Sequence, residues 1–334
     1  MNAKVRHIAV FSGKRGGFGA LMNLMTMINE HPKTRLSLIV TDMHLSRTFG
    51  YTVNEVKKHF KITSQLNLNQ KDDKSSSRAF ALGKCIVKVT KSLGKLKPDI
   101  LILLGDRGEV LSAAIAAIEL NIPIAHILGG DLAGNRDGNR IHAITKLAHI
   151  HFPSSLDSYK RILNLGEEKW RVHNFGATYI DNIVSKNYTP NIKVRAKYNL
   201  TSKENYIICI QHPTTLNEEK SYSESLNLFR VLKASKYKII LIYPCSDQGY
   251  QGVIKAINKF SSDKNFLIYK NIDAYDFWGL MEGASLFIGN SSSGLIETPY
   301  FNLPAINLGI RQKGRVRDSN VIDSSYEINS IKRS

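Results

Sequence analysis

The amino-acid sequence predicts an α/β protein made of two doubly wound domains that face each other across a cleft. Short runs of Ile, Val and Leu alternate with helical patterns along all 334 residues. These runs are apolar on both faces, which is typical of parallel strands in a sheet that helices cover on both sides. The pattern lapses in one polar stretch around Pro190, and we expect the domains to be joined there.

Each strand is predicted where an apolar run follows a polar turn and ends at a loop of small or polar residues. The predicted strands cover residues 7–12, 36–41, 99–105, 122–128, 172–176, 206–210, 238–243, 265–269, 285–289 and 306–307. The predicted organisation is a Rossmann-like domain over 1–182, a linker over 183–198, a second Rossmann-like domain over 199–312 and a C-terminal segment over 313–334. Ligands of such folds bind beyond the carboxyl ends of the strands, so functional residues should follow the strands.

The composition is that of a soluble globular protein, with 43% hydrophobic and 22% charged residues. We expect a cytoplasmic protein without a membrane partner, because no apolar run reaches the roughly 18 residues of a membrane helix and the first residues contain no signal-peptide cleavage site. Cys85, Cys209 and Cys245 lie far apart in the sequence, so neither a disulfide framework nor a metal site is expected.

The formal net charge of +18 raises the question of a nucleic-acid partner. The lysines are scattered, for example over 84–97 and 233–238, and aromatic residues are not interleaved with them. We therefore expect no nucleic-acid partner. A polyanionic small substrate such as a nucleotide diphosphate would also suit a basic chain.

The most informative segment is SLFIGNSSSGLIETP at residues 285–299. It predicts a buried strand, a loop of small residues and a helix start with a carboxylate at Glu297. The first N–H groups of a helix lack carbonyl partners and favour a phosphate. Ser291, Ser292 and Ser293 can add hydroxyl donors, and Gly294 allows close approach of the backbone. The alternative is a serine that simply caps an ordinary helix.

Two loops after predicted strands of the first domain have similar features. Ser12 to Gly19 form a glycine-rich turn with Lys14 and Arg15 ahead of a helix predicted from about Ala20, which resembles an anion cradle without the spacing of an ATP-binding Walker motif. After the strand at 99–105 come Asp106 and Arg107. From these residues alone, Asp106 can be a helix cap or a catalytic group.

The Gly-Gly turn after residues 122–128 leads to Asp131, Asp137 and His142. Carboxylates at the mouth of a parallel sheet are candidates for general acids or bases, because partial burial raises their pKa. In the second domain, His212 follows a strand and can donate to a phosphate or a sugar hydroxyl. Arg311 follows the last strand and offers a guanidinium for phosphate.

The ordered set of these segments resembles the hydrolysing UDP-N-acetylglucosamine 2-epimerases, bacterial enzymes of sialic and legionaminic acid synthesis. The resemblance covers nearly the whole chain and rests on TDMHLSRTFG (41–50), LGDRGE (104–109), AHILGGD (125–131), HAITKLAHIHF (142–152), QHPTT (211–215), IGNSSSGLIETP (288–299) and LPAINLGIRQKGR (303–315). It implies a glycosyltransferase-B-like fold, UDP binding chiefly by the C-terminal domain, a homo-oligomer (dimer or tetramer), and no metal or other cofactor.

The family's reaction removes the C2 proton of the sugar as UDP leaves C1, and water then adds to the 2-acetamidoglucal to give N-acetylmannosamine. The resemblance places acid–base and catalytic roles on Asp106, Asp131, Asp137 and His212. It assigns contacts with substrate or UDP to Arg15, Gly19, Arg107, His142, Ser291, Ser292, Ser293, Gly294, Glu297 and Arg311, with Glu297 on the ribose hydroxyls.

The sequence departs from the family pattern in four places and ends earlier than other members, at Ser334. The departures are Gly16-Gly17, Asp131 in place of glutamate, a displaced Arg140, and Cys245 in place of asparagine. Four alternatives stay open: UDP-N,N′-diacetylbacillosamine as the substrate, a non-hydrolysing epimerase, a glycosyltransferase of the same fold, and a degenerate UDP-sugar binding protein.

Overall fold

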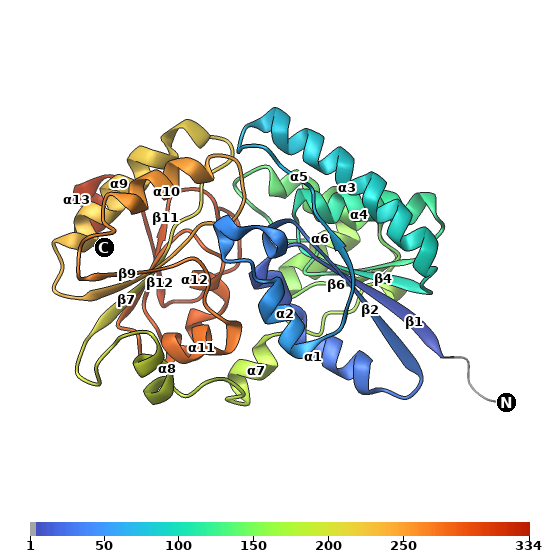
Figure 1. The fold of residues 1–334 in the computed structure, drawn as a ribbon, viewed down its shortest axis with the longest axis horizontal. Helices are drawn as coiled ribbons and strands as arrows, with labels where there is room; N and C mark the ends of the chain where they lie inside the picture. The colour runs from blue at the N-terminus through green and yellow to red at the C-terminus, as the bar shows by residue number, and fades with distance from the viewer. Residues whose placement is uncertain (1–4) are drawn as a thin grey trace. The chain divides into compact units, whose positions relative to one another are not determined.

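A computed structural model describes residues 5–334, which form two compact units. The first unit comprises the chain up to Leu132 together with Arg136–Asp181, and the second comprises Ala133–Asn135 and Asn182–Ser334. Each unit is a parallel sheet between helices, so the chain has two Rossmann-like domains (Figure 1).

The sheet of the first unit has the strand order β3-β2-β1-β4-β5-β6, and its neighbouring strands are parallel. The order reverses between β1 and β4, which makes this point the topological switch point of the sheet. The strands are β1 (Arg6–Ser12), β2 (Thr34–Thr41), β3 (Ile62–Leu66), β4 (Ile100–Leu104), β5 (Ile124–Ile127) and β6 (Ile150–Phe152).

Helices lie on both faces of this sheet, with α3 and α4 over one face and α1 over the other (Figure 1). The helices are α1 (Arg15–Glu30), α2 (Val53–His59), α3 (Ser75–Leu96), α4 (Gly108–Glu119), α5 (Asp137–Leu147) and α6 (Leu156–Asn164), and the 3-10 turns are Asp42–Leu45, Arg47–Phe49 and Lys169–Arg171. One face buries Phe11, Leu101 and Leu103 against Cys85 and Val89 of α3.

The sheet of the second unit repeats this plan in the order β12-β11-β10-β7-β8-β9, again with parallel neighbours. Its switch point lies between β7 and β10. The strands are β7 (Tyr206–Ile210), β8 (Lys238–Ile242), β9 (Phe266–Tyr269), β10 (Leu286–Gly289), β11 (Ala305–Leu308) and β12 (Val321–Ser324).

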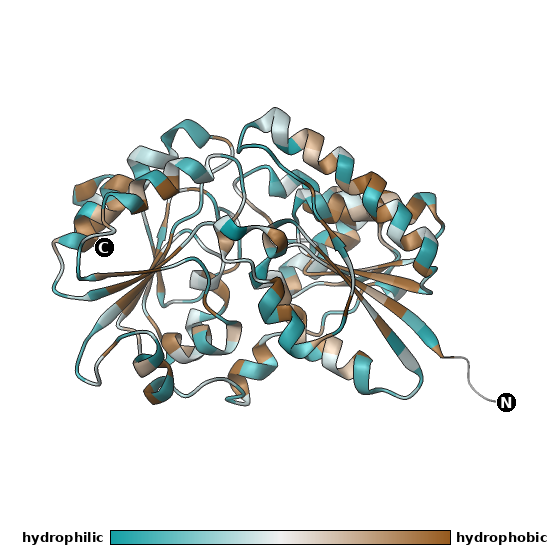
Figure 2. Cartoon of the chain, in the orientation of Figure 1, coloured by the Kyte–Doolittle hydropathy of each residue, from teal (hydrophilic) through white to brown (hydrophobic). Residues whose placement is uncertain are grey.

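The second sheet is also covered on both faces, by α9, α10 and α13 on one side and by α8, α11 and α12 on the other (Figure 1). Figure 2 shows that the strands of both sheets are largely hydrophobic, with hydrophilic stretches at the ends of some strands of the first sheet, whereas the helices carry more hydrophilic residues. The helices are α8 (Asn191–Lys197), α9 (Ser221–Lys233), α10 (Tyr250–Asn258), α11 (Ala274–Gly283), α12 (Ser293–Ile296) and α13 (Ile328–Arg333), and the 3-10 turns are Glu218–Lys220 and Thr298–Phe301.

The strand prediction was wrong at the edges of both sheets. The segment 172–176 is not a strand, because only Val172 forms a bridge, to His151 of the unpredicted β6. The edge strands β3 and β12 were also missed. Both are partly exposed, so they lack the continuous apolar run that identified the central strands.

The segment 183–198 is more structured than the linker that the sequence predicted. Helix α7 (Ile180–Val184) leads into it, and α8 packs against α11. Asn191 donates to Gly279 O (2.7 Å) and to the Tyr206 hydroxyl (2.9 Å). In residues 313–334, β12 pairs with β11, and Ile331 of α13 joins the core of the second unit.

Within residues 5–334, no helix is both long and apolar enough to cross a membrane. The expectation that the start of the chain contains no signal-peptide cleavage site includes residues 1–4, which lie outside the described part of the chain.

Two buried histidines of the first unit should make its stability depend on pH. Burial lowers the pKa of His44 and of His126 from the usual 6.5 to about 4. Between pH 6.5 and 4, these histidines are therefore protonated in the unfolded chain but neutral in the folded protein. As the pH falls through this range, we expect the free energy of unfolding to fall by up to about 1.4 kcal/mol per pH unit for each histidine.

Chemical denaturation of the His126→Gln variant over this pH range measures the contribution. We expect a shallower pH dependence than in the parent protein, whereas the same substitution at the exposed His31 should leave it unchanged. An unaltered slope in the His126 variant would contradict the assignment.

Candidate functional site

In the first unit, predicted site residues lie on both sides of the switch point. Arg15 follows β1 and Asp106 follows β4, and these two strands are neighbours in the sheet. Parallel strands end at the same edge, so both residues are presented at the position where ligands of doubly wound sheets bind. Asp131 extends the group, because it follows β5, the next strand along.

The N-terminus of α1 has the electrostatics of an anion site. The helix begins at Arg15, five residues earlier than predicted, so the glycine-rich segment is its first turn. Lys14 is the N-cap, and within the described chain this end of the helix has neither a side-chain cap nor an acidic residue in its first turn. Gly19 is buried in the second turn, where its N–H is internal to the helix.

Asp106 and Arg107 have different surroundings from those the sequence suggested. The N-cap of α4 is Arg107, so Asp106, which is half-buried, does not occupy the cap position. Arg107 is buried, and its guanidinium pairs with Glu109 Oε1 (2.6 Å) and Asp42 Oδ2 (3.2 Å). The guanidinium of Arg107 thus holds the loop after β4 against the carboxylates beneath it.

Arg78 of α3 completes this buried ion cluster and was missed by the sequence analysis. It pairs with Asp42 Oδ2 at 3.0 Å and with Glu109. Burial would raise the pKa of Glu109, but Arg107 and Arg78 outweigh this and lower it to about 2. Burial raises the pKa of Asp42, whereas Arg78 and Arg107 favour its ionised form. The contacts among these four side chains fix the base of the loop that carries Asp106.

Asp131 is presented by a turn that needs glycine. Gly130 has φ +81°, and a Cβ there would lie 2.5 Å from Ser158 O, so other residues would be strained. The Ser158 hydroxyl donates to Asp131 Oδ1 (2.5 Å), and Arg161 donates to Gly130 O (2.6 Å). These contacts with α6 fix the turn and orient the carboxylate.

Asp137 and His142 both lie on α5. Asp137 is the first residue of the helix, is buried, and accepts from Arg140 Nη1 (3.0 Å). This i, i+3 pair gives the displaced Arg140 a role in the structure. Burial, together with the nearby Arg161, lowers the pKa of His142, so its imidazole is neutral at pH 7.

In the second unit, Asn290 joins the two loops at the switch point. His212 follows β7 and Asn290 follows β10, its neighbour in the sheet. The backbone N–H of His212 donates to Asn290 Oδ1 (2.7 Å), and Asn290 Nδ2 donates to His212 O (2.8 Å). This pair of buried hydrogen bonds fixes the backbone that carries His212.

The contacts of His212 determine which ring nitrogen carries the proton. The backbone N–H of Cys245, after β8, donates to Nδ1 (3.0 Å), so Nδ1 is an acceptor. In the neutral ring Nε2 must then be the donor. This contact uses the backbone of Cys245, so it does not depend on the side chain at that position. A neutral His212 can donate a hydrogen bond from Nε2 to an oxygen of a ligand.

The serine loop forms the predicted turn, but the helix after it is short. Helix α12 has four residues and is followed by the 3-10 turn Thr298–Phe301, so its dipole contributes less than a long helix would. Ser291 is buried, and Ser292 and Ser293 are half-buried. Gly294 is required for packing, because a Cβ there would lie 2.8 Å from the Phe287 ring.

Glu297 and Arg311 are held by neighbours that the sequence did not identify. Trp278 Nε1 donates to Glu297 Oε1 (2.7 Å), and both residues are buried. Arg311 donates to Asn290 O (3.2 Å) and lies 3.5 Å from Asp247 Oδ2. The guanidinium of Arg311 is therefore anchored beside the end of β10.

Tyr326 connects the C-terminal segment to this site. Its hydroxyl accepts from Gln211 Nε2 (2.8 Å) and Asn290 Nδ2 (3.0 Å) and donates to Leu308 O (3.2 Å). The hydroxyl thus orients the side-chain amide of Asn290, which in turn holds His212. The sequence analysis missed Tyr326, since it lies more than a hundred residues from Gln211 along the chain.

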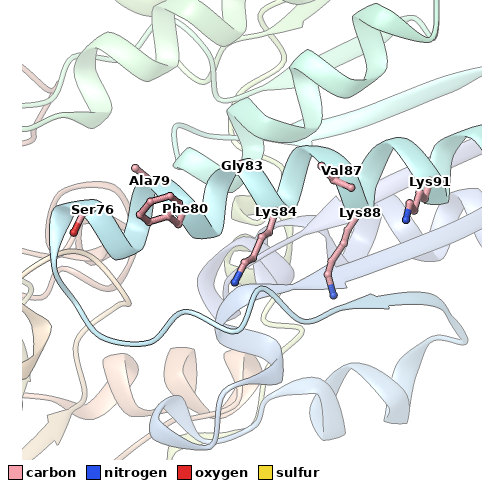
Figure 3. A pocket seen from close by; sticks show the side chains of 8 residues that line it. All are labelled: Ser76, Ala79, Phe80, Gly83, Lys84, Val87, Lys88 and Lys91. Carbon is pink, nitrogen blue, oxygen red and sulfur yellow. The ribbon is translucent and has the colours of Figure 1, made fainter.

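A cavity of about 810 Å³ lies on α3, away from these loops, and is shown in Figure 3. Lys84, Lys88, Lys91 and the exposed Phe80 are among the residues that line it, and it contains none of the predicted site residues. It lacks a carboxylate or histidine for acid–base chemistry. Among residues 5–334 there is also no group of three or more His, Cys, Asp or Glu side chains arranged to hold a metal ion.

Comparison with known proteins identifies the family. A family model described as UDP-N-acetylglucosamine 2-epimerase matches residues 26–334. The chain belongs to the UDP-N-acetylglucosamine 2-epimerase family.

Members of the UDP-N-acetylglucosamine 2-epimerase family align along nearly the whole chain. The UDP-N,N′-diacetylbacillosamine 2-epimerase (hydrolyzing) of Legionella pneumophila is 32% identical over 98% of this chain and 87% of its own length. The UDP-N-acetylglucosamine 2-epimerase of Neisseria meningitidis is 31% identical over 98% of this chain and 86% of its own. The crystal structure of Methanocaldococcus jannaschii UDP-GlcNAc 2-epimerase in complex with UDP-GlcNAc and UDP has the same fold, with a TM-score of 0.79 at 18% identity over 98% of this chain and 92% of that one.

In this member of the UDP-N-acetylglucosamine 2-epimerase family, Tyr326→Phe should lower stability. The substitution removes the acceptor of two buried amide donors, and we expect a loss of about 1–3 kcal/mol in the free energy of unfolding. Urea denaturation measures it, with Tyr300→Phe at an exposed position as the control. A change no larger than that of the control would show that Tyr326 does not hold the Gln211–Asn290 pair.

Proposed function

We propose that this protein is a hydrolysing UDP-amino-sugar 2-epimerase, with UDP-N-acetylglucosamine as the first candidate substrate. Membership of the UDP-N-acetylglucosamine 2-epimerase family supports this proposal. The observation that carries it is the arrangement at the switch point of the second unit, where His212 and the serine loop are joined by Asn290. This arrangement offers neutral hydrogen-bond donors and the guanidinium of Arg311 to a diphosphate.

In the proposed reaction, the bond between C1 and the UDP oxygen breaks as a carboxylate removes the C2 proton. The electrons of the C2–H bond form the C1–C2 double bond of the 2-acetamidoglucal, and UDP leaves. Water then adds across this double bond and places its hydroxyl at C1. The new proton reaches C2 on the face opposite to the one from which the original proton was removed. N-acetylmannosamine and UDP are the products, so atoms and charge balance without an external oxidant or reductant.

Stabilisation of the leaving group should contribute most to catalysis, because a C2 proton is weakly acidic. Arg311, His212 and the serine loop act on the departing diphosphate in this proposal, and Arg15 adds a cation at the start of α1. Proton transfer is assigned to Asp106, Asp131 and Asp137. Arg107 is assigned an indirect role, since its guanidinium pairs with Asp42 and Glu109.

UDP-N,N′-diacetylbacillosamine is the second candidate substrate. Relatives from Legionella pneumophila and Campylobacter jejuni that are 32% and 33% identical carry names that include this substrate. The two sugars differ at C4 and C6, away from the bonds that react. We also propose that the protein is cytoplasmic and forms a homo-oligomer, a dimer or a tetramer.

Product analysis in heavy water tests the proposed reaction. Incubation with each UDP-sugar and no acceptor should give one UDP for each free mannosamine-type sugar, with one deuterium at C2, measured by mass spectrometry. A requirement for an acceptor sugar would identify a glycosyltransferase instead. Release of the epimer still attached to UDP would identify a non-hydrolysing epimerase, and binding without turnover would identify a UDP-sugar binding protein.

The Asp131→Asn variant tests the acid–base assignment. We expect a loss of about two to four orders of magnitude in turnover, the usual contribution of one acid–base group, with nearly unchanged affinity for UDP. Asp157→Asn, at an exposed position of α6, is the matched control. Turnover of the Asp131 variant at the parental rate would refute the role.

A further inference from the structure

The loop between β1 and α1 is held by a turn that lies about thirty residues further along the chain. The backbone N–H of Met43, in the 3-10 turn after β2, donates to Gly13 O (3.0 Å). The imidazole Nε2 of His44, in the same turn, lies 2.9 Å from the Ser12 hydroxyl. The turn after β2 therefore fixes the backbone just ahead of α1.

Glu109 of α4 packs directly against the same loop. A Cβ on Gly13 would lie 2.6 Å from Glu109 Oε1, so the carboxylate occupies the space where any other residue would have its side chain. Glu109 is fully buried, and Arg107 Nε donates to this Oε1 atom (2.6 Å). The position of the Glu109 carboxylate thus limits where Gly13 can lie.

Arg78 of α3 joins these two contacts. Its Nη1 donates to Oδ2 of Asp42 (3.0 Å), which is the first residue of the turn that holds Gly13. Its Nη2 donates to Glu109 Oε2. Because a guanidinium is planar and has several fixed donors, it sets the separation of the two carboxylates, which a single ammonium group cannot do.

We propose that Arg78 is a positioning residue for the reaction, and that it acts through Asp42 and Glu109 on the loop after β1. Arg15 begins α1 two residues after Gly13, so a shift of Gly13 would move the cation that the proposed function places on the leaving diphosphate. This inference rests on the proposed function, because it concerns catalysis at that site. Arg78 does not contact the substrate in this assignment.

A purely structural role for the buried ion cluster is the competing explanation. Removal of one partner from a buried ion pair lowers stability, because the remaining charge is uncompensated. If stability were the whole effect, each folded molecule of a variant would turn over at the parental rate. A positioning role instead predicts a loss of turnover in molecules that are fully folded.

The kinetics of Arg78→Lys separate the two roles. Lysine keeps the positive charge of the cluster, but its ammonium cannot make both contacts in the same geometry. At a temperature where circular dichroism shows the variant to be folded, we expect turnover at saturating substrate to fall about ten- to hundredfold, the effect of a displacement of about 1 Å in a catalytic site. The affinity for UDP should change less than about threefold, because most of the proposed diphosphate contacts belong to the second unit.

Hydrogen exchange of the full chain tests the same inference without a ligand. Amides of residues 13–19 should exchange faster in Arg78→Lys than in the parent protein, because the contacts that hold the loop are weakened. Arg6→Lys is the matched control, since Arg6 belongs to the first unit and its side chain is 67% exposed and 4.0 Å from Asp99. The control should leave both turnover and the exchange of residues 13–19 unchanged.

Parental turnover in folded Arg78→Lys, or unchanged exchange of residues 13–19, would overturn the inference. If this variant does not fold, Gly13→Ala gives a second test, because its Cβ must displace the Glu109 carboxylate. Turnover should then fall as well, and parental turnover would overturn the inference. Absence of turnover in the parent protein would instead refute the proposed function, and the exchange of residues 13–19 would still show whether Arg78 holds the loop.

Discussion

The parallel arrangement of both sheets is the constraint on which the site depends. When all neighbouring strands run in one direction, every loop that follows a strand emerges at the same edge of the sheet. In each unit the strand order reverses once, and the two loops on either side of the reversal diverge. Arg15 and Asp106 are placed by this rule in the first unit, and His212 and Ser291 in the second.

Polar loops at such an edge need partners that hold them in one conformation. In the second unit, Asn290 binds both backbone groups of His212, and the Tyr326 hydroxyl accepts from the side-chain amides of Asn290 and Gln211. A single side-chain amide therefore determines how the histidine is presented. Loss of one member leaves buried donors without acceptors, so the network favours one arrangement strongly.

In the first unit, buried ion pairs hold the loop after β4 in one conformation. Two guanidinium groups and two carboxylates are buried together beneath the loop after β4. Removal of one charge would leave an uncompensated ion in the interior, which is more costly than the loss of an exposed ion pair. The sequence suggested that Arg107 contacts the substrate. In the structure its guanidinium instead pairs with Asp42 and Glu109.

The sequence by itself determined the fold class, the central strands and the loops that carry Asp131, His212 and the serines, because these follow from local hydrophobic patterns and from the order of strands. It did not determine the edge strands β3, β6 and β12, which are short or partly exposed and lack a continuous apolar run. Only the tertiary structure revealed Arg78, Trp278 and Tyr326 as partners of site residues. Their contacts join segments far apart in the chain, and such pairings arise from packing of the whole unit and leave no local pattern in the sequence.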